Sequence, residues 1–283
     1  MPELPEVETI ARTLRSAIAG KRIAEIFLSG KTLRRPVPAN LDARLRNRTV
    51  RTVHRRGKYL IVEVKPPAFW LIHLGMSGRL LYTRDAAGRP RHTHAAIRFA
   101  GGGELQYRDP RRFGLLDVYE ETSLDELPEV KRLGIDPLSS FISAAWLRQE
   151  LANTRRDLKS FLLDQRKVAG VGNIYASEIL YLARLNPQRR CHTLSRQEAA
   201  ALARAITHVL RVAVDHHGTS FSDFRDSDGR RGVHQDFLRV FQREGKKCHR
   251  CPARIRRLRQ GNRSTYYCPR CQGRRPGGTR KRK

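Results

Sequence analysis

Long apolar runs are what this chain of 283 residues lacks most clearly. The best candidate for a membrane span, Ala68–Leu74, is much shorter than the roughly 18 residues that a spanning helix needs, and His73 interrupts it. The N-terminus, MPELPEVE, is acidic and has too few apolar residues for a signal peptide. We therefore expect a soluble, cytoplasmic protein.

Cysteine and acidic residues are also scarce. Five cysteines in a chain of this length exclude a disulfide-rich secreted scaffold. Asp and Glu total 27 against 57 Lys and Arg, so the formal net charge is +30 at pH 7. Because 39% of the residues are hydrophobic, the chain can fill a core and is not disordered. A strongly basic folded protein favours a polyanionic partner, most often nucleic acid.

The positive charge is concentrated at the C-terminus. The last 33 residues hold 12 Lys and Arg and no Asp or Glu. We interpret residues 273–283 as a disordered basic tail. Such a tail either keeps the protein in solution or adds non-specific phosphate contacts, and the second role is favoured.

Two kinds of hydrophobic pattern divide the remaining chain. Residues 5–19 have the period of an amphipathic helix, which Gly20 ends. Short, often alternating runs between residues 23 and 119 predict strands of a β-sandwich or barrel. Helical periodicity follows in residues 143–153, 156–166, 173–184 and 195–217. The expected domains are residues 1–133, a linker at 134–141, a helical domain at 142–236, and a cysteine-bearing unit at 237–272.

Four cysteines occur as two C-x-x-C pairs near the C-terminus. Cys248 and Cys251 form the first pair, and Cys268 and Cys271 form the second after 16 intervening residues. This spacing is typical of a zinc site in which four thiolates complete a tetrahedron. The alternatives are two disulfides, which a reducing cytosol disfavours, or coincidence. With all positions filled by protein, the expected zinc ion is structural.

A glycine-rich turn precedes the helix expected to begin near residue 173. It reads Gly170-Val171-Gly172-Asn173, and glycines before a helix let a phosphate approach the free backbone amides. Asn173 is alternatively the N-cap of that helix, a role that is compatible with a phosphate contact.

Five motifs occur in one order: PELPEVE, HLGMSG, DPRRFG, VAGVGNIYASE and the four-cysteine unit. Together they closely resemble the formamidopyrimidine-DNA glycosylase family, from residue 2 to about residue 272. The resemblance implies an α+β multidomain fold. Its parts are a β-sandwich with an N-terminal helix, a helix–two-turns–helix domain, and a C-terminal β-hairpin zinc finger.

The resemblance also implies covalent catalysis by the chain terminus. Removal of Met1 frees the secondary amine of Pro2, which attacks the deoxyribose C1′ and forms a Schiff base. The positive end of the helix that follows favours the neutral, nucleophilic amine. Glu3 matches the acid that protonates the sugar ring oxygen. The family's catalytic lysine corresponds to Lys58, and its supporting residues correspond to Glu6 and Lys159.

Residues in two further motifs match those that contact DNA in the family. Met76, Arg111 and Phe113 correspond to a wedge that fills the gap left by an extruded nucleotide, with Arg111 facing the orphaned cytosine. Asn173 and Arg263 correspond to phosphate-binding residues of the turn and the finger. Without the resemblance, Met76 and Phe113 are equally well explained as members of small apolar clusters.

Some positions depart from the family pattern. The loop Ser220–Asp236 matches the loop that caps the damaged base through Asp228-Gly229 and Gly232. Val233-His234 stands where an aromatic pair is expected, and Phe241-Gln242 where Tyr-Gly is expected. These differences concern the base pocket.

The expected function is that of a bifunctional DNA glycosylase and AP lyase in base excision repair. It removes 8-oxoguanine and formamidopyrimidines from duplex DNA and cleaves the strand by β,δ-elimination. We expect a monomer with one structural zinc ion, associated with the bacterial nucleoid and not with a membrane. One alternative is an endonuclease VIII-like enzyme for oxidised pyrimidines, although PELPE replaces that group's usual PEGPE. The other is a non-enzymatic nucleic-acid-binding zinc protein.

Overall fold

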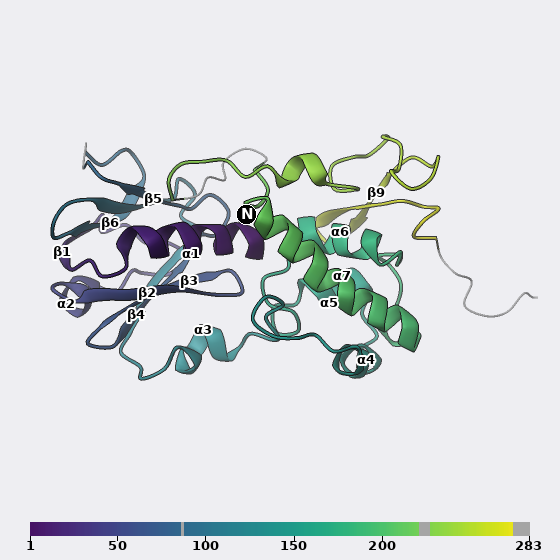
Figure 1. Ribbon diagram of the computed structural model, residues 1–283, viewed down its shortest axis with the longest axis horizontal. Coiled ribbons are helices and arrows are strands. Elements are labelled where there is room, and N and C mark those ends of the chain that lie inside the picture. Colours follow the sequence, from purple (N-terminus) through teal and green to yellow (C-terminus); the bar gives the residue numbers. More distant parts are fainter. Residues whose placement is uncertain (86–87, 221–226, 274–283) are drawn as a thin grey trace, which may run out of the picture. The chain divides into compact units, whose positions relative to one another are not determined.

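The computed structural model describes residues 1–85, 88–220 and 227–273, which form two compact units (Figure 1). The first unit comprises Met1–Leu133 and Ala213–Gln235. The second comprises Gly134–Val212 and the described residues from Asp236 onward. The sequence groups residues 213–235 with the helical domain, whereas in the structure they pack with the first unit.

The first unit is built on two antiparallel sheets of four strands each. One sheet has the order β1 (Ile23–Leu28), β6 (Thr93–Phe99), β7 (Glu104–Arg108) and β5 (Arg79–Thr83). The other has the order β2 (Thr49–Arg56), β3 (Tyr59–Lys65), β4 (Ala68–His73) and β8 (Leu115–Tyr119). This arrangement confirms the predicted β-sandwich. The short helices α2 (Leu41–Leu45) and α3 (Pro128–Lys131) and the 3-10 turn Leu124–Glu126 are too brief to show a period in the sequence.

Helix α1 (Leu4–Ile18) joins the two sheets. It contacts β2 and β3 of one sheet and β5 of the other, and Figure 1 shows it running along the strands of this unit. Its buried apolar side chains belong to the same hydrophobic core as those of both sheets. They are Val7, Ile10, Ala11, Leu14 and Ile18, the face predicted from the sequence. Burial of this face fixes the direction in which the N-terminus of α1 points.

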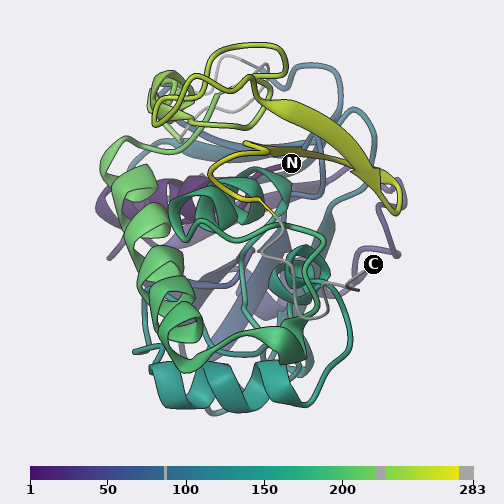
Figure 2. The same cartoon turned by 90° about the vertical axis from the view of Figure 1, so that its right-hand side faces the viewer.

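The second unit contains helices and the hairpin of the cysteine-bearing segment. Its elements are α4 (Ala144–Ala152), α5 (Leu158–Leu163), α6 (Asn173–Leu182), most of α7 (Arg196–Asp215), β9 (Arg256–Gln260) and β10 (Arg263–Tyr267). Short 3-10 turns cover Cys191–Thr193 and His234–Phe237. Ser143 caps α4 and Asp157 caps α5 through side-chain oxygens. Figure 2 shows the hairpin (yellow) beside these helices, and β10 contacts α6.

Residues 134–141, predicted to be a linker, belong to the second unit and are paired with it at their start, whereas residues 139–141 are exposed. The amide of Gly134 donates to the carbonyl of Gln165 at 2.9 Å, and Ile135 forms a parallel bridge with Val168. A Cβ at Gly134 would lie 2.4 Å from the carbonyl oxygen of Arg166. Backbone pairing of this kind involves no side-chain pattern, so the sequence does not reveal it.

None of the helices in the described ranges has both the length and the apolar character that a membrane span requires.

Candidate functional site

The N-terminus of α1 brings two acidic side chains into the interior of the first unit. Glu3 and Glu6 are 3% and 2% exposed and form a capping box, in which the Glu3 amide donates to Glu6 Oε2 at 2.8 Å. Glu6 Oε1 also accepts the amide of Thr219 at 2.7 Å. Met1 is half exposed and Pro2 is partly exposed. An accessible chain terminus therefore directly precedes two buried carboxyl groups.

Close packing around Glu6 explains a glycine later in the chain. Gly218 has a φ of +77°, and a Cβ there would lie 2.9 Å from Glu6 Oε1. Glycine adopts this conformation without strain and leaves room for the carboxylate. The segment after α7 is thereby held against the start of α1.

Lys58 lies at the turn between β2 and β3 and is buried, being 7% exposed. The turn is tied to α1 by Arg55, whose Nε donates to Glu8 Oε2 at 2.7 Å and whose Nη1 donates to the Gly57 carbonyl at 3.3 Å. Burial raises the pKa of Glu8, but its ion pairs with Arg55 and Arg12 outweigh this and leave that pKa below its usual value. Glu8 is therefore a structural anion that fixes the Lys58 turn.

His73, the last residue of β4, is buried and carries no charge at neutral pH. Burial lowers the pKa of His73 to about 3, and the positive charges of Arg34 and Lys58 contribute to this. Its Nδ1 accepts the amide of Gly75 at 3.0 Å. The neutral imidazole thus helps to shape the turn that carries Met76.

The three predicted wedge residues come together on two adjoining turns of the first unit. Met76 and Phe113 are 49% and 43% exposed, so both turns present a large apolar side chain to solvent. The guanidinium carbon of Arg111, also exposed, lies 4.6 Å from the centroid of the Phe113 ring. A Cβ at Gly75 would lie 2.5 Å from the carbonyl carbon of Phe113, so the turns touch through their backbones.

In the second unit, Lys159 and Asn173 meet at one carbonyl of the finger hairpin. Lys159 Nζ donates to the Ser264 carbonyl at 3.0 Å and to Thr265 Oγ1 at 2.6 Å, and Asn173 Nδ2 donates to the same carbonyl at 3.1 Å. Lys159 is 1% exposed. The ammonium of Lys159 thus lies inside this unit, under the hairpin, and its predicted role as a supporting residue stays a prediction.

Asn173 is the first residue of α6, and Gly172 occupies the N-cap position. Asn173 is therefore not the N-cap of α6, and its contact with a phosphate stays a prediction. Its Oδ1 is buried without a hydrogen-bond partner among the described residues. The helix start and this side chain lie beside β10, which begins at Arg263.

The hairpin β9–β10 presents a dense set of cations. Arg263 opens β10 opposite Gln260 and is exposed. Further exposed arginines lie on β9 and just before it, namely Arg254, Arg256, Arg257 and Arg259. Such a surface suits the sugar-phosphate backbone of a nucleic acid.

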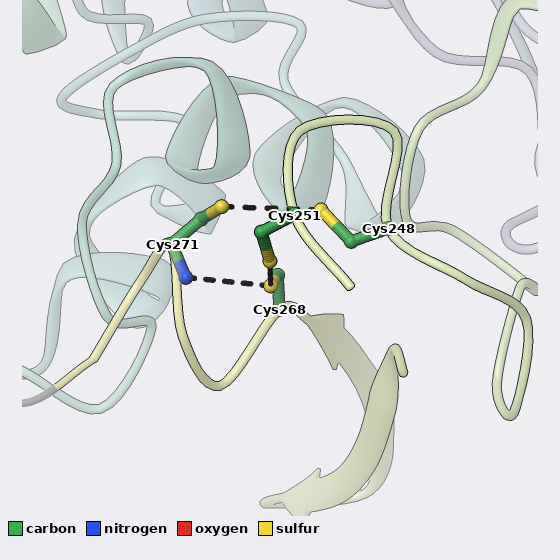
Figure 3. A group of neighbouring side chains, drawn as sticks. All are labelled: Cys248, Cys251, Cys268 and Cys271. Atoms are coloured by element: carbon green, nitrogen blue, oxygen red, sulfur yellow. Dashed lines mark hydrogen bonds between the residues drawn. The ribbon is translucent and has the colours of Figure 1, made fainter. Parts of the chain in front are cut away.

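The four predicted cysteine ligands converge at the base of this hairpin (Figure 3). The sulfur atoms of Cys248 and Cys271 are 3.9 Å apart, those of Cys251 and Cys268 are 3.5 Å apart, and all four lie within 4.8 Å of one another. Zn–S bonds of about 2.3 Å place tetrahedral sulfurs about 3.8 Å apart. The geometry fits one structural zinc ion with four thiolates, and no disulfide is present among these residues.

The departures from the family pattern have physical consequences. Gln242 has a φ of +56°, a conformation that favours glycine, which explains why the family prefers Gly there. Phe241 packs edge-on against Tyr266 with 5.1 Å between ring centroids. Val233 is exposed, whereas His234 is buried with Nδ1 3.1 Å from that of His216. Residues 221–226 of the predicted base-capping loop lie outside the described residues.

Two buried carboxylates, Glu178 and Asp109, are not apparent from the sequence. Glu178 on α6 accepts the amides of Arg239, Val240 and Phe241, and burial raises its pKa. Asp109 is fully buried between the two wedge turns. Glu178 is the last residue of the motif VAGVGNIYASE, and Asp109 is the first residue of DPRRFG. In both motifs the predicted functional residues are others.

Models of known protein families match three segments of the chain. The formamidopyrimidine-DNA glycosylase N-terminal domain matches residues 1–116, and the H2TH domain of the same proteins matches residues 133–225. A zinc finger found in FPG and IleRS matches residues 245–273. These segments follow the order of β-sandwich, helices and finger in the structure.

Relatives match along nearly the whole chain. Formamidopyrimidine-DNA glycosylase of Pelotomaculum thermopropionicum is 40% identical over 273 residues, which are 96% of this chain and 99% of the relative. That of Gluconobacter oxydans is 40% identical over 276 residues, 96% of this chain and 100% of the relative.

Solved structures agree with these relatives. Lactococcus lactis Fpg in complex with DNA that contains an abasic site has a TM-score of 0.87 at 33% identity, covering 96% of this chain and 99% of that one. The MutM (Fpg) protein of Thermus thermophilus has a TM-score of 0.85 at 38% identity, with the same coverage. Agreement in motifs, fold and whole-length identity shows that the chain belongs to the formamidopyrimidine-DNA glycosylase family.

Proposed function

We propose that the chain is a bifunctional DNA glycosylase and AP lyase that removes oxidised purines from duplex DNA. The observation that carries this proposal is the accessible Pro2 directly before the buried pair Glu3 and Glu6. A protein that only binds nucleic acid has no use for a terminal imino group at such a place. The net charge of +30 further supports association with the bacterial nucleoid.

The chemistry follows from an amine nucleophile and a nearby acid. Once Met1 is removed, the nitrogen of Pro2 bonds to the sugar C1′ and the damaged base leaves with the electrons of the glycosidic bond. Glu3 protonates the ring oxygen as the C1′–O4′ bond opens, which gives an iminium ion. The iminium acidifies C2′, so that β-elimination releases the 3′ phosphate and δ-elimination then releases the 5′ phosphate and the sugar.

The exposed side chains supply the DNA contacts that this reaction needs. Extrusion of a nucleotide leaves a gap in the stack, and the exposed Met76 and Phe113 are apolar groups suited to fill it. Arg111 offers donors to the unpaired base opposite the gap. In the second unit, the start of α6 at Asn173 offers backbone amides, and the exposed finger arginine Arg263 offers a cation, for phosphate binding.

A lesion panel tests the substrate class. Duplexes with a single 8-oxoguanine or formamidopyrimidine opposite cytosine should be cut faster than duplexes with thymine glycol or dihydrothymine. Gel separation should show a one-nucleotide gap with phosphates at both ends. Faster cutting of the oxidised pyrimidines would favour the endonuclease VIII-like alternative, and binding without cutting of any lesion would favour a non-enzymatic protein.

Arg111 should make excision depend on the base opposite the lesion. Cytosine offers acceptors on its exposed pairing edge, so 8-oxoguanine should be removed faster opposite cytosine than opposite adenine. Replacement of Arg111 by alanine should reduce this rate ratio by about tenfold or more, because a good bidentate base contact gives about 1–3 kcal/mol of discrimination. Single-turnover rates on the two duplexes measure the ratio.

Arg46→Ala is a suitable control for Arg111→Ala. Arg46 lies at the surface just after α2 and forms an ion pair with Asp42 on that helix, so its loss removes a similar charge. The ratio of the control should equal that of the unmodified protein. Equal rates opposite cytosine and adenine in the unmodified protein would refute the role of Arg111.

A further inference from the structure

Asp109 follows strand β7 and is completely buried, yet its carboxylate accepts four hydrogen bonds. Oδ1 accepts Ser77 Oγ at 2.5 Å and the amide of Arg111 at 3.3 Å. Oδ2 accepts the amide of Gly114 at 2.8 Å and the hydroxyl of Tyr107 at 3.2 Å. A buried carboxylate is tolerated when its lone pairs are satisfied in this way.

Three of these four donors come from the two turns that carry the wedge, and the fourth, Tyr107, lies on β7. Ser77 follows Met76 on one turn, whereas the amides of Arg111 and Gly114 flank Phe113 on the other. Ser77 Oγ additionally accepts the Arg111 amide at 3.3 Å. One buried carboxylate therefore joins the two turns whose Met76 and Phe113 side chains are exposed.

The backbone of Asp109 is held as firmly as its side chain. Its amide donates to the carbonyl of His92 at 3.0 Å, and its carbonyl lies 3.0 Å from Nε2 of His94. Burial lowers the pKa of His94, which favours the neutral ring, and Nδ1 of that ring lies 3.1 Å from Ser29 Oγ. With Nε2–H as the donor and Nδ1 as the acceptor, this chain of contacts fixes Asp109 to β6.

Charge neutralisation does not explain the presence of an acid here. Within residues 1–85, 88–220 and 227–273, no lysine or arginine side chain forms an ion pair with Asp109. The groups that donate hydrogen bonds to Asp109 are two backbone amides and two hydroxyls, and all four are uncharged. A carboxylate differs from other side chains in accepting on both oxygens at once, and that is what a link between two turns requires.

We propose that Asp109 is a positioning residue that holds the Met76 turn and the Arg111–Phe113 turn together as one preformed reader of the opposite base. The proposal rests on the proposed function, because the reader acts on duplex DNA. Asp109 touches no DNA itself. It acts by keeping the guanidinium of Arg111 in one place before DNA binds, which lowers the cost of ordering that side chain.

The first test is Asp109→Asn. The amide keeps the size of the side chain but has one accepting oxygen instead of two, so the backbone amide of either Arg111 or Gly114 faces an NH2 group and loses its bond to this side chain. The cytosine-to-adenine ratio for 8-oxoguanine excision should fall by about fivefold or more, given the strength of hydrogen bonds to a buried carboxylate. Ser77→Ala removes the Ser77 hydroxyl, with its bonds to Asp109 and to the Arg111 amide, but leaves both oxygens of Asp109 in place, so it should lower the ratio less. Asp42→Asn, at the surface of α2, is the matched control and should leave the ratio unchanged.

A double variant separates positioning from general loosening. If Asp109 acts through Arg111, then Asp109→Asn should change the ratio no further in a protein that already carries Arg111→Ala. Cleavage of a single-stranded abasic oligonucleotide, which has no opposite base, should be altered less than twofold by Asp109→Asn.

Hydrogen exchange provides a readout that is independent of activity. In the unmodified protein the amides of Arg111 and Gly114 should exchange slowly, and in Asp109→Asn both should exchange faster, together with the Met76 turn.

If the asparagine variant does not fold, as judged by its melting curve and zinc content, Ser77→Ala is measured in its place. The proposal would be overturned if Asp109→Asn were active with unchanged amide exchange and an unchanged cytosine-to-adenine ratio. It would also be overturned if Asp109→Asn lowered that ratio as much in the Arg111→Ala protein as in the unmodified one. An unmodified protein that cuts no lesion contradicts the proposed function instead, and the exchange experiment then still decides whether Asp109 joins the turns.

Discussion

Borohydride is expected to trap this protein covalently on a duplex that contains 8-oxoguanine, with the crosslink at Pro2. The reducing agent converts an iminium ion between the Pro2 nitrogen and C1′ into a stable amine, so the adduct reports the intermediate directly. Replacement of Pro2 by glycine supplies a primary amine at a different position and should reduce strand cleavage by about a hundredfold or more, as expected for loss of a nucleophile. Peptide mapping of the adduct and single-turnover gels measure both effects.

Two companion proteins make this result specific. Protein that retains Met1 has no free Pro2 amine and should be inactive, although its fold is the same. Pro90→Gly changes an exposed proline of a loop in the same unit and should leave cleavage unchanged. The mechanism is falsified if protein that retains Met1 is fully active, or if the adduct maps to a lysine such as Lys58 alone.

Substitution of Glu3 should affect base excision and strand cleavage to different extents. Glu3→Gln removes the proton donor to the sugar ring oxygen, so base excision should fall more than cleavage at an abasic site made beforehand, where the ring opens spontaneously. The buried setting of Glu3 at the capping box means that the amide variant keeps a similar shape. Loss of both activities to the same extent would assign Glu3 a structural role only.

Much of the architecture was predictable because its elements follow simple periods. The apolar face of α1 and the alternating strands of the sandwich are buried as their spacing requires. The cysteine spacing likewise identified the metal ligands, since two tight turns bring four sulfurs together whatever surrounds them.

What the sequence did not reveal depends on contacts between distant segments. Lys159 bonds to Ser264 and Thr265, more than a hundred residues further along the chain, and nothing in its local pattern indicates that partner. Glu178 on α6 and Asp109 just after β7 are missed for the same reason, because a charged residue is normally assigned to the surface. Only the structure shows that backbone amides satisfy them.

Removal of zinc should abolish DNA binding by the finger. An isolated two-stranded hairpin is only marginally stable in water, and the core beneath β9–β10 consists largely of the metal ligands with Tyr181, Val240 and Ile255. Zinc ligation contributes about 10–16 kcal/mol to the folding of comparable finger peptides. Cys268→Ser, at a fully buried ligand, should therefore lose the ion and unfold the hairpin that presents Arg263. Affinity for lesion-bearing duplex should fall by about a hundredfold at physiological salt, because several phosphate contacts are lost together.

Cys191 offers the matched control for this experiment. It is a buried cysteine outside the cluster, and burial raises its pKa to about 12, so it is neither a thiolate nor a metal ligand at neutral pH. Cys191→Ala should retain one zinc ion per chain and bind DNA as the unmodified protein does. The salt dependence of binding should be shallower in Cys268→Ser than in Cys191→Ala, because fewer counterions are released when the finger arginines no longer reach the phosphates. A Cys268→Ser protein with full zinc content and an unchanged salt slope would show that the finger is held by its side-chain packing and not by the metal.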